Sequence, residues 1–549
     1  MLACRDMPSF DDALARLDHF VRQRLSASAT PGLALALTDH DHLLHVATYG
    51  YADVAARRPV TPDTLFDIAS IGKWFTAVAL LQQHEAGLLD LHAPVSASLP
   101  WFGLRSRFAP ITAHHLLSHT AGLAISYTET PGSRYDAAAL RDVEAAYAPG
   151  AHFHYSNTGY KALGFLLEAV CGRSRAAAIE EGIYAPLDMS ASVATVTQEW
   201  RERMAVGYAA RYDDRPERRG APPLPAPWVE FTTGDGGGVS TATDMAAYAR
   251  MILNRGRGPR GRILSPESFA LMARPVAGHA FDQDGLSYGY GVIIEDVDGH
   301  TYLGHGGGAP GYQSAVLADM DAGLGVVTLV NDGRGAPHLA VARTALGLLR
   351  AVIADAPWPD LPELRDPVRV EDAVAYVGLY RAGGGDTPLA VIAEGERLMV
   401  AYEGGRLTLE RRGPGTFYVD HPAFDRFLLR FGRADGRVVE VFHGPDWYVN
   451  ERYTGPTSFV YPTAWGAYPG HYRSHNPWAS NVRIVLRKGA LALVYPNGSE
   501  QPLVPLDDGA FRLGAADHSP ERVRFDTVID GQALRASLSG ELYYRALTA

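Results

Sequence analysis

Lysine is nearly absent from this sequence, and so is cysteine. Lys and Arg together number 50, but lysine stands only at positions 73, 161 and 488. The two cysteines are Cys4 and Cys171, which excludes both a disulfide framework and a cysteine-rich metal site. Because arginine supplies nearly all the basic charge, each lysine is expected to do something that arginine cannot. A desolvated lysine can lose its proton and act as a base, whereas arginine stays protonated.

Long hydrophobic runs and basic patches are missing too. The longest apolar pieces, such as Leu324 to Val330, are the size of a strand and far shorter than the roughly 18 residues that cross a membrane. The net charge is −11, and no cluster of basic residues is interleaved with aromatic ones. We therefore predict no membrane span and no nucleic-acid partner.

The N-terminus shows no secretory signal, because charges recur at helical spacing between Phe10 and Leu25 in place of an apolar segment. This predicts a cytoplasmic protein. Leu2, Ala3 and Cys4 resemble the end of a lipoprotein signal, but no apolar segment precedes them; a truncated start would make the protein periplasmic.

The chain is long enough for roughly two or three domains. From residue 10 to 355, apolar strands alternate with amphipathic helices, which indicates an α/β domain over 1–355. A hairpin is expected from Gly32 to Thr48, and helices at Trp74 to Glu85, Tyr160 to Val170 and Asp244 to Leu253.

Beyond a proline-rich linker, short alternating strands and an internal repeat predict two copies of one antiparallel β-barrel domain, at 366–458 and 462–549. Tyr376-Val377-Gly378-Leu379-Tyr380-Arg381 recurs as Tyr468-Pro469-Gly470-His471-Tyr472-Arg473.

Three motifs carry the chemistry. Ser70 and Lys73 are three residues apart on one face of an apolar helix, so a hydroxyl and an amine can touch near a helix N-terminus. Tyr155 and Asn157 lie between a loop and a helix and offer a phenol and an amide. A glycine-rich stretch from Gly304 to Gly308 lets a substrate backbone approach a strand edge.

In this order, Ser70-x-x-Lys73, Tyr155-x-Asn157 and His305-x-Gly307 resemble the motifs of the penicillin-recognising serine hydrolases. That family is related to class C β-lactamases, D-alanyl-D-alanine carboxypeptidases and D-stereospecific aminopeptidases. The resemblance covers about residues 10 to 350 and includes His115-Leu116-Leu117-Ser118-His119-Thr120-Ala121-Gly122-Leu123. It implies a β-lactamase/transpeptidase-like fold, with an antiparallel sheet flanked by helices and a helical subdomain.

The resemblance also implies roles for single residues. Ser70 would be acylated, Lys73 and Tyr155 would share the proton transfers, and Asn157 would hold the substrate amide. The oxyanion would lie between the backbone N–H groups of Ser70 and Gly308. Which of Lys73 or Tyr155 takes the first proton stays open.

The third motif departs from many relatives, which have Lys-Thr-Gly where this chain has His305, Gly306 and Gly307. The positive charge and the hydroxyl that bind a carboxylate are missing, so efficient β-lactamase activity is not expected. A histidine at the first position of this motif resembles the motif of the D-aminopeptidases. Some of those enzymes also carry two β-barrel domains after the catalytic domain. A D-aminopeptidase or D-amino-acid amidase is therefore the leading hypothesis.

Other functions stay open. A promiscuous carboxylesterase or a β-lactamase would use the same residues. A receptor that deacylates slowly, and so senses β-lactams or peptidoglycan fragments, belongs to another class. We expect a small-molecule or short-peptide substrate and no cofactor, and a homodimer remains open.

Several patterns are better explained without chemistry. Gly306 to Gly311 formally fits a dinucleotide fingerprint, but Pro310 and the lack of a following helix argue against it. Gly238 to Ala242 lacks the last glycine of a nucleophile elbow. His40, His42 and His45 lie at a predicted turn and are more simply solvated than bound to an ion, so no metal is expected. Packing and hydrogen bonding are expected for the three loop histidines His114, His115 and His119. Lys161 is expected at the surface.

Overall fold

A computed structural model of the chain describes residues 9–104, 106–126, 144–231, 233–382 and 388–546. The chain divides into two compact units. One contains residues 1–210 and 222–362, and the other contains residues 211–221 and 363–549. Cys4 lies outside the described residues, and Cys171 is a free thiol.

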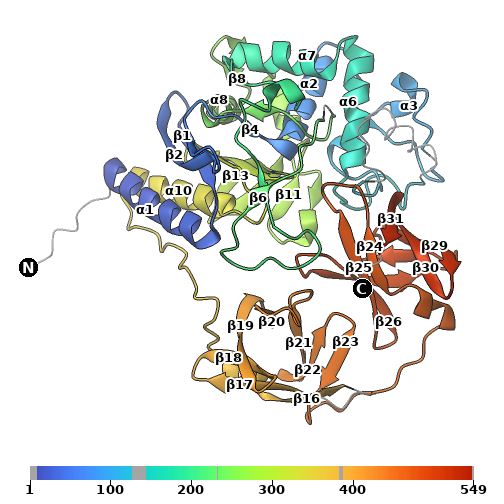
Figure 1. The fold of residues 1–549 in the computed structure, drawn as a ribbon. Helices are drawn as coiled ribbons and strands as arrows, with labels where there is room; N and C mark the ends of the chain where they lie inside the picture. Colours follow the sequence, from blue (N-terminus) through green and yellow to red (C-terminus); the bar gives the residue numbers. More distant parts are fainter. Residues whose placement is uncertain (1–8, 105, 127–143, 232, 383–387, 547–549) are drawn as a thin grey trace, which may run out of the picture. The chain divides into compact units, whose positions relative to one another are not determined.

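The first unit is built on a nine-stranded antiparallel sheet (Figure 1). The expected hairpin is present as its two N-terminal strands, which pair through Leu35 and Ala47. The last strand of the sheet pairs with the first, so the two ends of the unit meet in the middle of the sheet. In spatial order the strands are β10 (Ala277–Gly278), β11 (Leu286–Tyr288), β12 (Ile293–Val297), β13 (His300–Ala309), β14 (Tyr312–Asp319), β15 (Leu324–Val330), β1 (Gly32–Thr38), β2 (Leu43–Asp53) and β3 (Arg58–Pro59).

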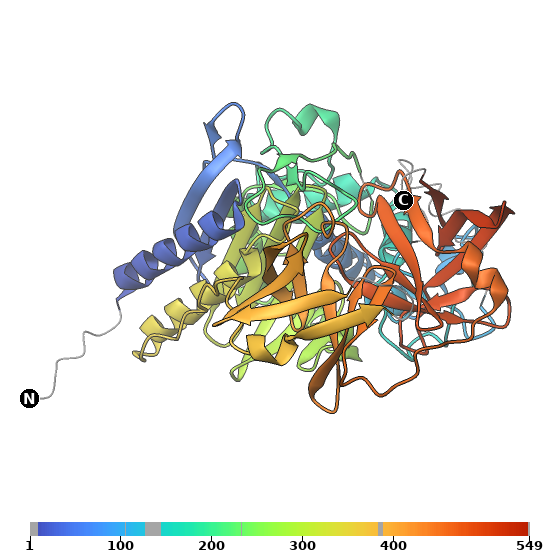
Figure 2. The same cartoon turned by 60° about the horizontal axis from the view of Figure 1, so that its bottom comes forward.

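Helices cover both faces of this sheet because its central strands are apolar on both sides. All residues of β1 are buried; Leu33, Leu35 and Leu37 pack on one face and Ala34 and Ala36 on the other. The leucine face is covered by α1 (Phe10–Ser28) and α10 (His338–Ile353), which lie side by side in both views (Figures 1 and 2). The alanine face is covered by α8 (Ala242–Leu253). Small side chains on that face let the helix approach closely.

A helical part stands beside the sheet. Its centre is α2 (Gly72–Glu85), buried from Gly72 to Leu81, and α6 (Asn157–Cys171), which packs against it. Shorter helices surround α6, namely α3 (Val95–Ser98), α4 (Ala113–Leu117) and α7 (Arg175–Ile179). The prediction that Lys161 lies at the surface was wrong: only 4% of it is exposed, because α6 is packed on several sides.

The second unit contains two closed eight-stranded antiparallel barrels, as the repeat predicted. Closure gives every strand of a barrel a neighbouring strand on each side. In the first barrel β16 pairs with β23, and in the second β24 pairs with β31. The first comprises β16 (Gly378–Ala382), β17 (Leu389–Glu394), β18 (Arg397–Tyr402), β19 (Gly405–Gly413), β20 (Thr416–Val419), β21 (Leu429–Ala434), β22 (Arg437–His443) and β23 (Asp446–Val449). The second comprises β24 (Gly470–Arg473), β25 (Asn481–Arg487), β26 (Ala490–Val494), β27 (Glu500–Pro505), β28 (Phe511–Leu513), β29 (Arg522–Ile529), β30 (Gln532–Leu538) and β31 (Glu541–Arg545).

The repeat holds at the level of single atoms. The Tyr380 hydroxyl donates to the carbonyl of Tyr376 at 2.7 Å, and the Tyr472 hydroxyl donates to the carbonyl of Tyr468 at the same distance. Both hydroxyl-bearing rings are fully buried. The repeated Tyr-x-Gly-x-Tyr motif therefore specifies a buried tyrosine with a satisfied hydroxyl in each barrel.

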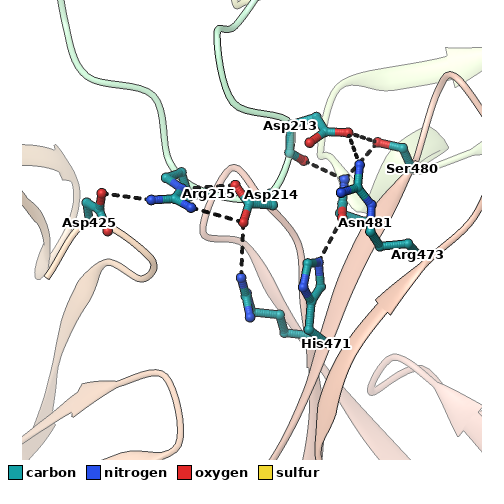
Figure 3. A network of polar contacts seen from close by, with 9 residues as sticks. Asp213, Asp214, Arg215, Asp425, His471, Arg473, Ser480 and Asn481 are labelled. Carbon is teal, nitrogen blue, oxygen red and sulfur yellow. Dashed lines mark hydrogen bonds and ion pairs between the residues drawn. The ribbon is translucent and has the colours of Figure 1, made fainter. Parts of the chain in front are cut away.

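Residues 211–221 are a separate piece of the second unit, and they contact both barrels through charges (Figure 3). Arg215 donates to Asp214 and to Asp425 of the first barrel, both at 2.9 Å. Asp213 accepts from Ser480 and Arg473 of the second barrel at 2.9 and 3.2 Å. This segment therefore ties the barrels together through ion pairs and hydrogen bonds.

None of the described helices combines the length and the apolar character that a membrane crossing needs.

Candidate active site

Ser70 and Lys73 meet as their spacing predicts. Ser70 lies in a short 3₁₀ turn, Ala69–Ile71, which leads directly into α2, and the Lys73 Nζ donates to the Ser70 Oγ at 3.1 Å. Lys73 is fully buried, whereas Ser70 is half-buried and lines a cavity. The hydroxyl is therefore open to a substrate while the amine is shielded from water.

The surroundings of Lys73 contain backbone and aromatic groups. The Nζ donates to the carbonyl of Asp235 and lies 4.9 Å from the centre of the Tyr155 ring. No carboxylate forms an ion pair with it among the described residues. The amine is therefore held against Ser70 by a backbone carbonyl and an aromatic ring.

A glycine explains how the Asp235 carbonyl reaches Lys73. A Cβ at Gly72 would lie 2.8 Å from the carbonyl oxygen of Gly237, so only glycine lets the segment 234–238 run against the start of α2. The same segment accepts a hydrogen bond at the Gly234 carbonyl from Thr76 at 2.9 Å. The glycine inside the Ser70-x-x-Lys73 motif is thus a packing requirement.

Tyr155 and Asn157 enter the site from the start of α6. Ser156 caps this helix by accepting from the N–H of Gly159 at 3.1 Å, which places Tyr155 just before the cap and Asn157 in the first turn. Tyr155 lines the same cavity as Ser70. The Asn157 Oδ1 is buried and has no hydrogen-bond partner among the described residues, and Asn157 is not one of the residues that line the cavity.

The glycine-rich stretch lies on β13, where one edge of the strand is free. Pairing with β12 ends at Gly304, opposite Ile293, and in the described structure residues His305 to Ala309 pair with β14 only. Gly306, Gly307 and Gly308 line the cavity along this free edge. A substrate backbone can therefore add to the strand there. Ser70 and Gly308, the predicted oxyanion donors, face one cavity.

His305 is buried and neutral. Its Nδ1 lies 2.6 Å from the carbonyl of Gly306, so Nδ1 carries the proton, and its Nε2 lies 3.1 Å from the Tyr288 hydroxyl, which donates to it. Burial and then the charge of Lys73 lower the pKa of His305 to about 3. The third motif therefore brings no positive charge to the site at neutral pH.

The cavity at Ser70 has a volume of about 270 Å³ and is lined only by residues of the first unit. Besides the predicted residues it is lined by Phe281, Ile293, Gln313 and His338. Neither arginine nor lysine is among the described lining residues. These lining side chains therefore offer no cation to a substrate carboxylate.

The geometry agrees with comparisons to known proteins. A sequence profile described as Beta-lactamase matches residues 17–351, which is most of the first unit and contains all three motifs. The chain belongs to the beta-lactamase family. It is therefore a serine hydrolase.

Relatives in the beta-lactamase family have several activities in their names. Penicillin-binding protein 4 of Amycolatopsis lactamdurans is 30% identical over 65% of this chain and 94% of its own length. Esterase EstB of Burkholderia gladioli is 30% identical over 60% of this chain and 94% of its own length. A D-aminopeptidase of Brucella ovis is 28% identical over 59% of this chain and 60% of its own length.

The structure of an octameric penicillin-binding protein homologue from Pyrococcus abyssi is similar at a TM-score of 0.58 and 26% identity. The match covers 80% of this chain and all of that one. The two proteins therefore share a fold over most of this chain.

One group of side chains among the described residues is close enough to hold a cation: His300, Asp319 and Asp321. The Nδ1 of His300 already lies 3.0 Å from Asp319 Oδ1, and Arg350 Nε lies 3.8 Å from Asp319 Oδ2. None of the three lines the catalytic cavity. His40 and His42 are exposed, and His45 is half-buried.

Sequence reasoning missed the cavity walls and the Asp235 carbonyl. Asp235 is 162 positions from Lys73, and only the packing of two segments brings them together. The loop histidines were assigned to packing and hydrogen bonding, and this is confirmed for His114, whose Nδ1 lies 2.6 Å from the Tyr290 hydroxyl.

Proposed function

We propose that this beta-lactamase-family serine hydrolase cleaves amide bonds next to a D-amino acid, as a D-aminopeptidase or D-amino-acid amidase. The observation that carries the proposal is the neutral third motif, in which His305 is buried and uncharged and Gly306 has no side chain. It favours substrates without a carboxylate beside the scissile bond. The relative named D-aminopeptidase supports the assignment.

The reaction would proceed through an acyl-enzyme. The Ser70 oxygen forms a bond to the substrate carbonyl carbon, and its proton passes to Lys73 or Tyr155. The negative charge that develops on the carbonyl oxygen is stabilised by the N–H groups of Ser70 and Gly308. The C–N bond breaks as the amine takes a proton, and water then releases the acid and regenerates the Ser70 hydroxyl.

Substrate preference follows from charge. A charged hydrogen bond to a carboxylate contributes about 1.5–3 kcal/mol, or about ten- to a hundredfold in affinity. The cavity has no such donor at His305 or Gly306. Compounds that present a carboxylate here lose this contribution, whereas amino-acid amides and esters lose nothing.

A panel of four chromogenic substrates tests the proposal: D- and L-alanine p-nitroanilide, a short-chain p-nitrophenyl ester and a cephalosporin. We expect a higher kcat/KM for D- than for L-alanine p-nitroanilide, and little turnover of the cephalosporin. Cephalosporin turnover above that of the other three would point to a β-lactamase. Equal kcat/KM values for the D- and L-anilides would contradict the proposed preference for D-amino acids.

A carboxylesterase is the second candidate, and the apolar wall formed by Phe281 and Ile293 favours it. Ester turnover far above that of both anilides would select it. A receptor that stays acylated would instead give a stoichiometric burst without turnover.

A further inference from the structure

His119 is a buried residue with a strained backbone, two positions after α4. Only 1% of its surface is exposed, and its φ of 56° lies in the left-handed region that side chains other than glycine and asparagine rarely adopt. Such a conformation costs about 1–3 kcal/mol and persists only where neighbouring contacts impose it. The contacts of His119 show what imposes it.

His119 holds both chain neighbours of Tyr155. Its carbonyl oxygen accepts from the N–H of His154 at 2.8 Å, and its Nδ1 accepts from the N–H of Ser156 at 3.0 Å. Its ring packs against the Tyr155 ring, with 4.3 Å between the centroids. One residue therefore determines the backbone on each side of Tyr155 and the position of its ring.

The hydrogen bond from Ser156 also determines the protonation of His119. Because Nδ1 is the acceptor, the proton of the neutral ring lies on Nε2, which has no hydrogen-bond partner within the described structure. Burial, and after it the nearby charge of Lys73, lower the pKa of His119 well below its usual value. A second proton would have to take the Nδ1 lone pair and break the bond to Ser156.

Aromatic rings close the remaining sides of His119. Its centroid lies 4.9 Å from that of Tyr160 and 4.8 Å from that of Tyr288. Tyr288 also donates to His305, and Lys73 lies 4.9 Å from the Tyr155 ring. His119 thus connects residues of the helical part and of the sheet at the point where Tyr155 enters the cavity.

We infer that His119 is a positioning residue, which in its neutral Nε2–H form holds the Tyr155 hydroxyl where it delivers a proton to the leaving group. The inference rests on the proposed function, in which Tyr155 takes part in proton transfer. An amide nitrogen must be protonated to leave, whereas p-nitrophenolate leaves as an anion. Misplacing Tyr155 should therefore slow amide cleavage more than cleavage of a p-nitrophenyl ester.

Two substitutions separate this role from a merely structural one. His119→Ala removes the ring and the acceptor for Ser156. His119→Asn keeps a side-chain acceptor near Nδ1, and asparagine tolerates a positive φ better than most residues that have a side chain. We expect His119→Ala to lower kcat on D-alanine p-nitroanilide about 100-fold with KM nearly unchanged, and to lower p-nitrophenyl acetate turnover less than about tenfold. The kcat of His119→Asn on the anilide should be at least about tenfold higher than that of His119→Ala.

His115→Ala is the matched control, because His115 is a half-buried histidine of the neighbouring helix α4, and its Nδ1 contacts Thr112. His115→Ala should lower kcat on both substrates by the same small factor. Equal losses on the two substrates in a folded His119→Ala enzyme, or no recovery in His119→Asn, would overturn the role of His119. Absence of turnover by the wild-type enzyme on either substrate would instead overturn the proposed function.

A measurement without turnover checks the same inference. In ¹⁵N-histidine-labelled protein, long-range ¹H–¹⁵N correlation spectra should show His119 as a neutral Nε2–H tautomer from pH 5 to pH 9, about two units on either side of neutrality. An Nδ1–H tautomer, or titration in this range, would contradict the inference.

Discussion

The Nζ of Lys73, in the first turn of the buried helix α2, donates at 3.1 Å to the Oγ of Ser70, which lies in the 3₁₀ turn just before that helix. The contact joins the only hydroxyl of the first motif to one of three lysines in the chain. Ser70→Ala should abolish turnover, because it removes the hydroxyl that is proposed to be acylated. Lys73→Arg and Lys73→Met should each lower kcat/KM at least about 1,000-fold, since neither side chain can exchange a proton with Ser70.

Burst kinetics on the p-nitrophenyl ester would measure acylation and deacylation separately. Lys488→Arg in the second barrel is the control. Substantial activity in a folded Lys73→Met enzyme would exclude Lys73 as the base.

Tyr155 lines the cavity and packs beside Lys73. Tyr155→Phe removes the phenolic hydroxyl and keeps the ring that contacts His119. We expect kcat on the anilide to fall about 100- to 10,000-fold with little change in KM or in thermal stability. An unchanged kcat would leave Tyr155 with a packing role.

Gly306 is a position where a hydroxyl can be added. A Cβ there would meet only the Ser314 carbonyl oxygen, at 3.7 Å, so serine fits without displacement. Gly306→Ser should raise kcat/KM for the cephalosporin about tenfold by donating to its carboxylate. Gly307→Ser is the contrasting variant, because its Cβ would collide with the backbone oxygen of Ile68. It should lower the melting temperature and all activities. No gain in Gly306→Ser would show that the carboxylate does not reach this strand.

Asp67 should make stability depend on pH. This carboxyl is 3% exposed, and burial raises its pKa to about 7, although it accepts from the N–H of Ala69 at 2.7 Å. Between pH 4 and 7 the folded state holds a proton that the unfolded state has lost, so the contribution of Asp67 to stability falls as pH rises through this range.

Asp67→Asn keeps an acceptor for Ala69 and removes the titration. The free energy of unfolding of Asp67→Asn minus that of wild type should be larger by about 4 kcal/mol at pH 8 than at pH 4, because only wild type loses stability as pH rises. Urea unfolding of both proteins at the two pH values measures the difference. A difference that does not change with pH would place the pKa of Asp67 near its usual value.

Arg215 should stabilise the segment 211–221 on the barrels. Its side chain is 24% exposed and lies between Asp214 and Asp425, which are 19% and 23% exposed. Arg215→Ala leaves two partly buried carboxylates without this cation, so amide hydrogen exchange across 211–221 should become about ten- to a hundredfold faster. Arg218→Ala is the control, since its pair with Asp420 is 65% and 50% exposed. Equal rates of amide hydrogen exchange in the two variants would contradict a stabilising role of Arg215 in this segment.

Local chemistry explains what the sequence predicted correctly. The spacing of Ser70 and Lys73 on one helix, the helix start after Ser156, and the repeated Tyr-x-Gly-x-Tyr motif all specify contacts within a few residues. Periodicity of 2 and 3.6 residues indicated the hairpin, the main helices and the two barrels, because buried faces impose those periods.

Tertiary structure decided the burial, the protonation and the long-range contacts of the site, because these depend on residues that are far apart in the chain. The same pattern that predicts an exposed lysine at position 161 cannot show that α6 is packed on several sides. Nothing near His119 in sequence indicates that its carbonyl and its Nδ1 enclose Tyr155. The neutral state of His305 likewise depends on burial beneath residues from other strands and helices. The sequence by itself determined the reactive groups and their local geometry, whereas the packed fold determined their protonation, their positions and the walls of the cavity, since desolvation exists only once distant segments meet.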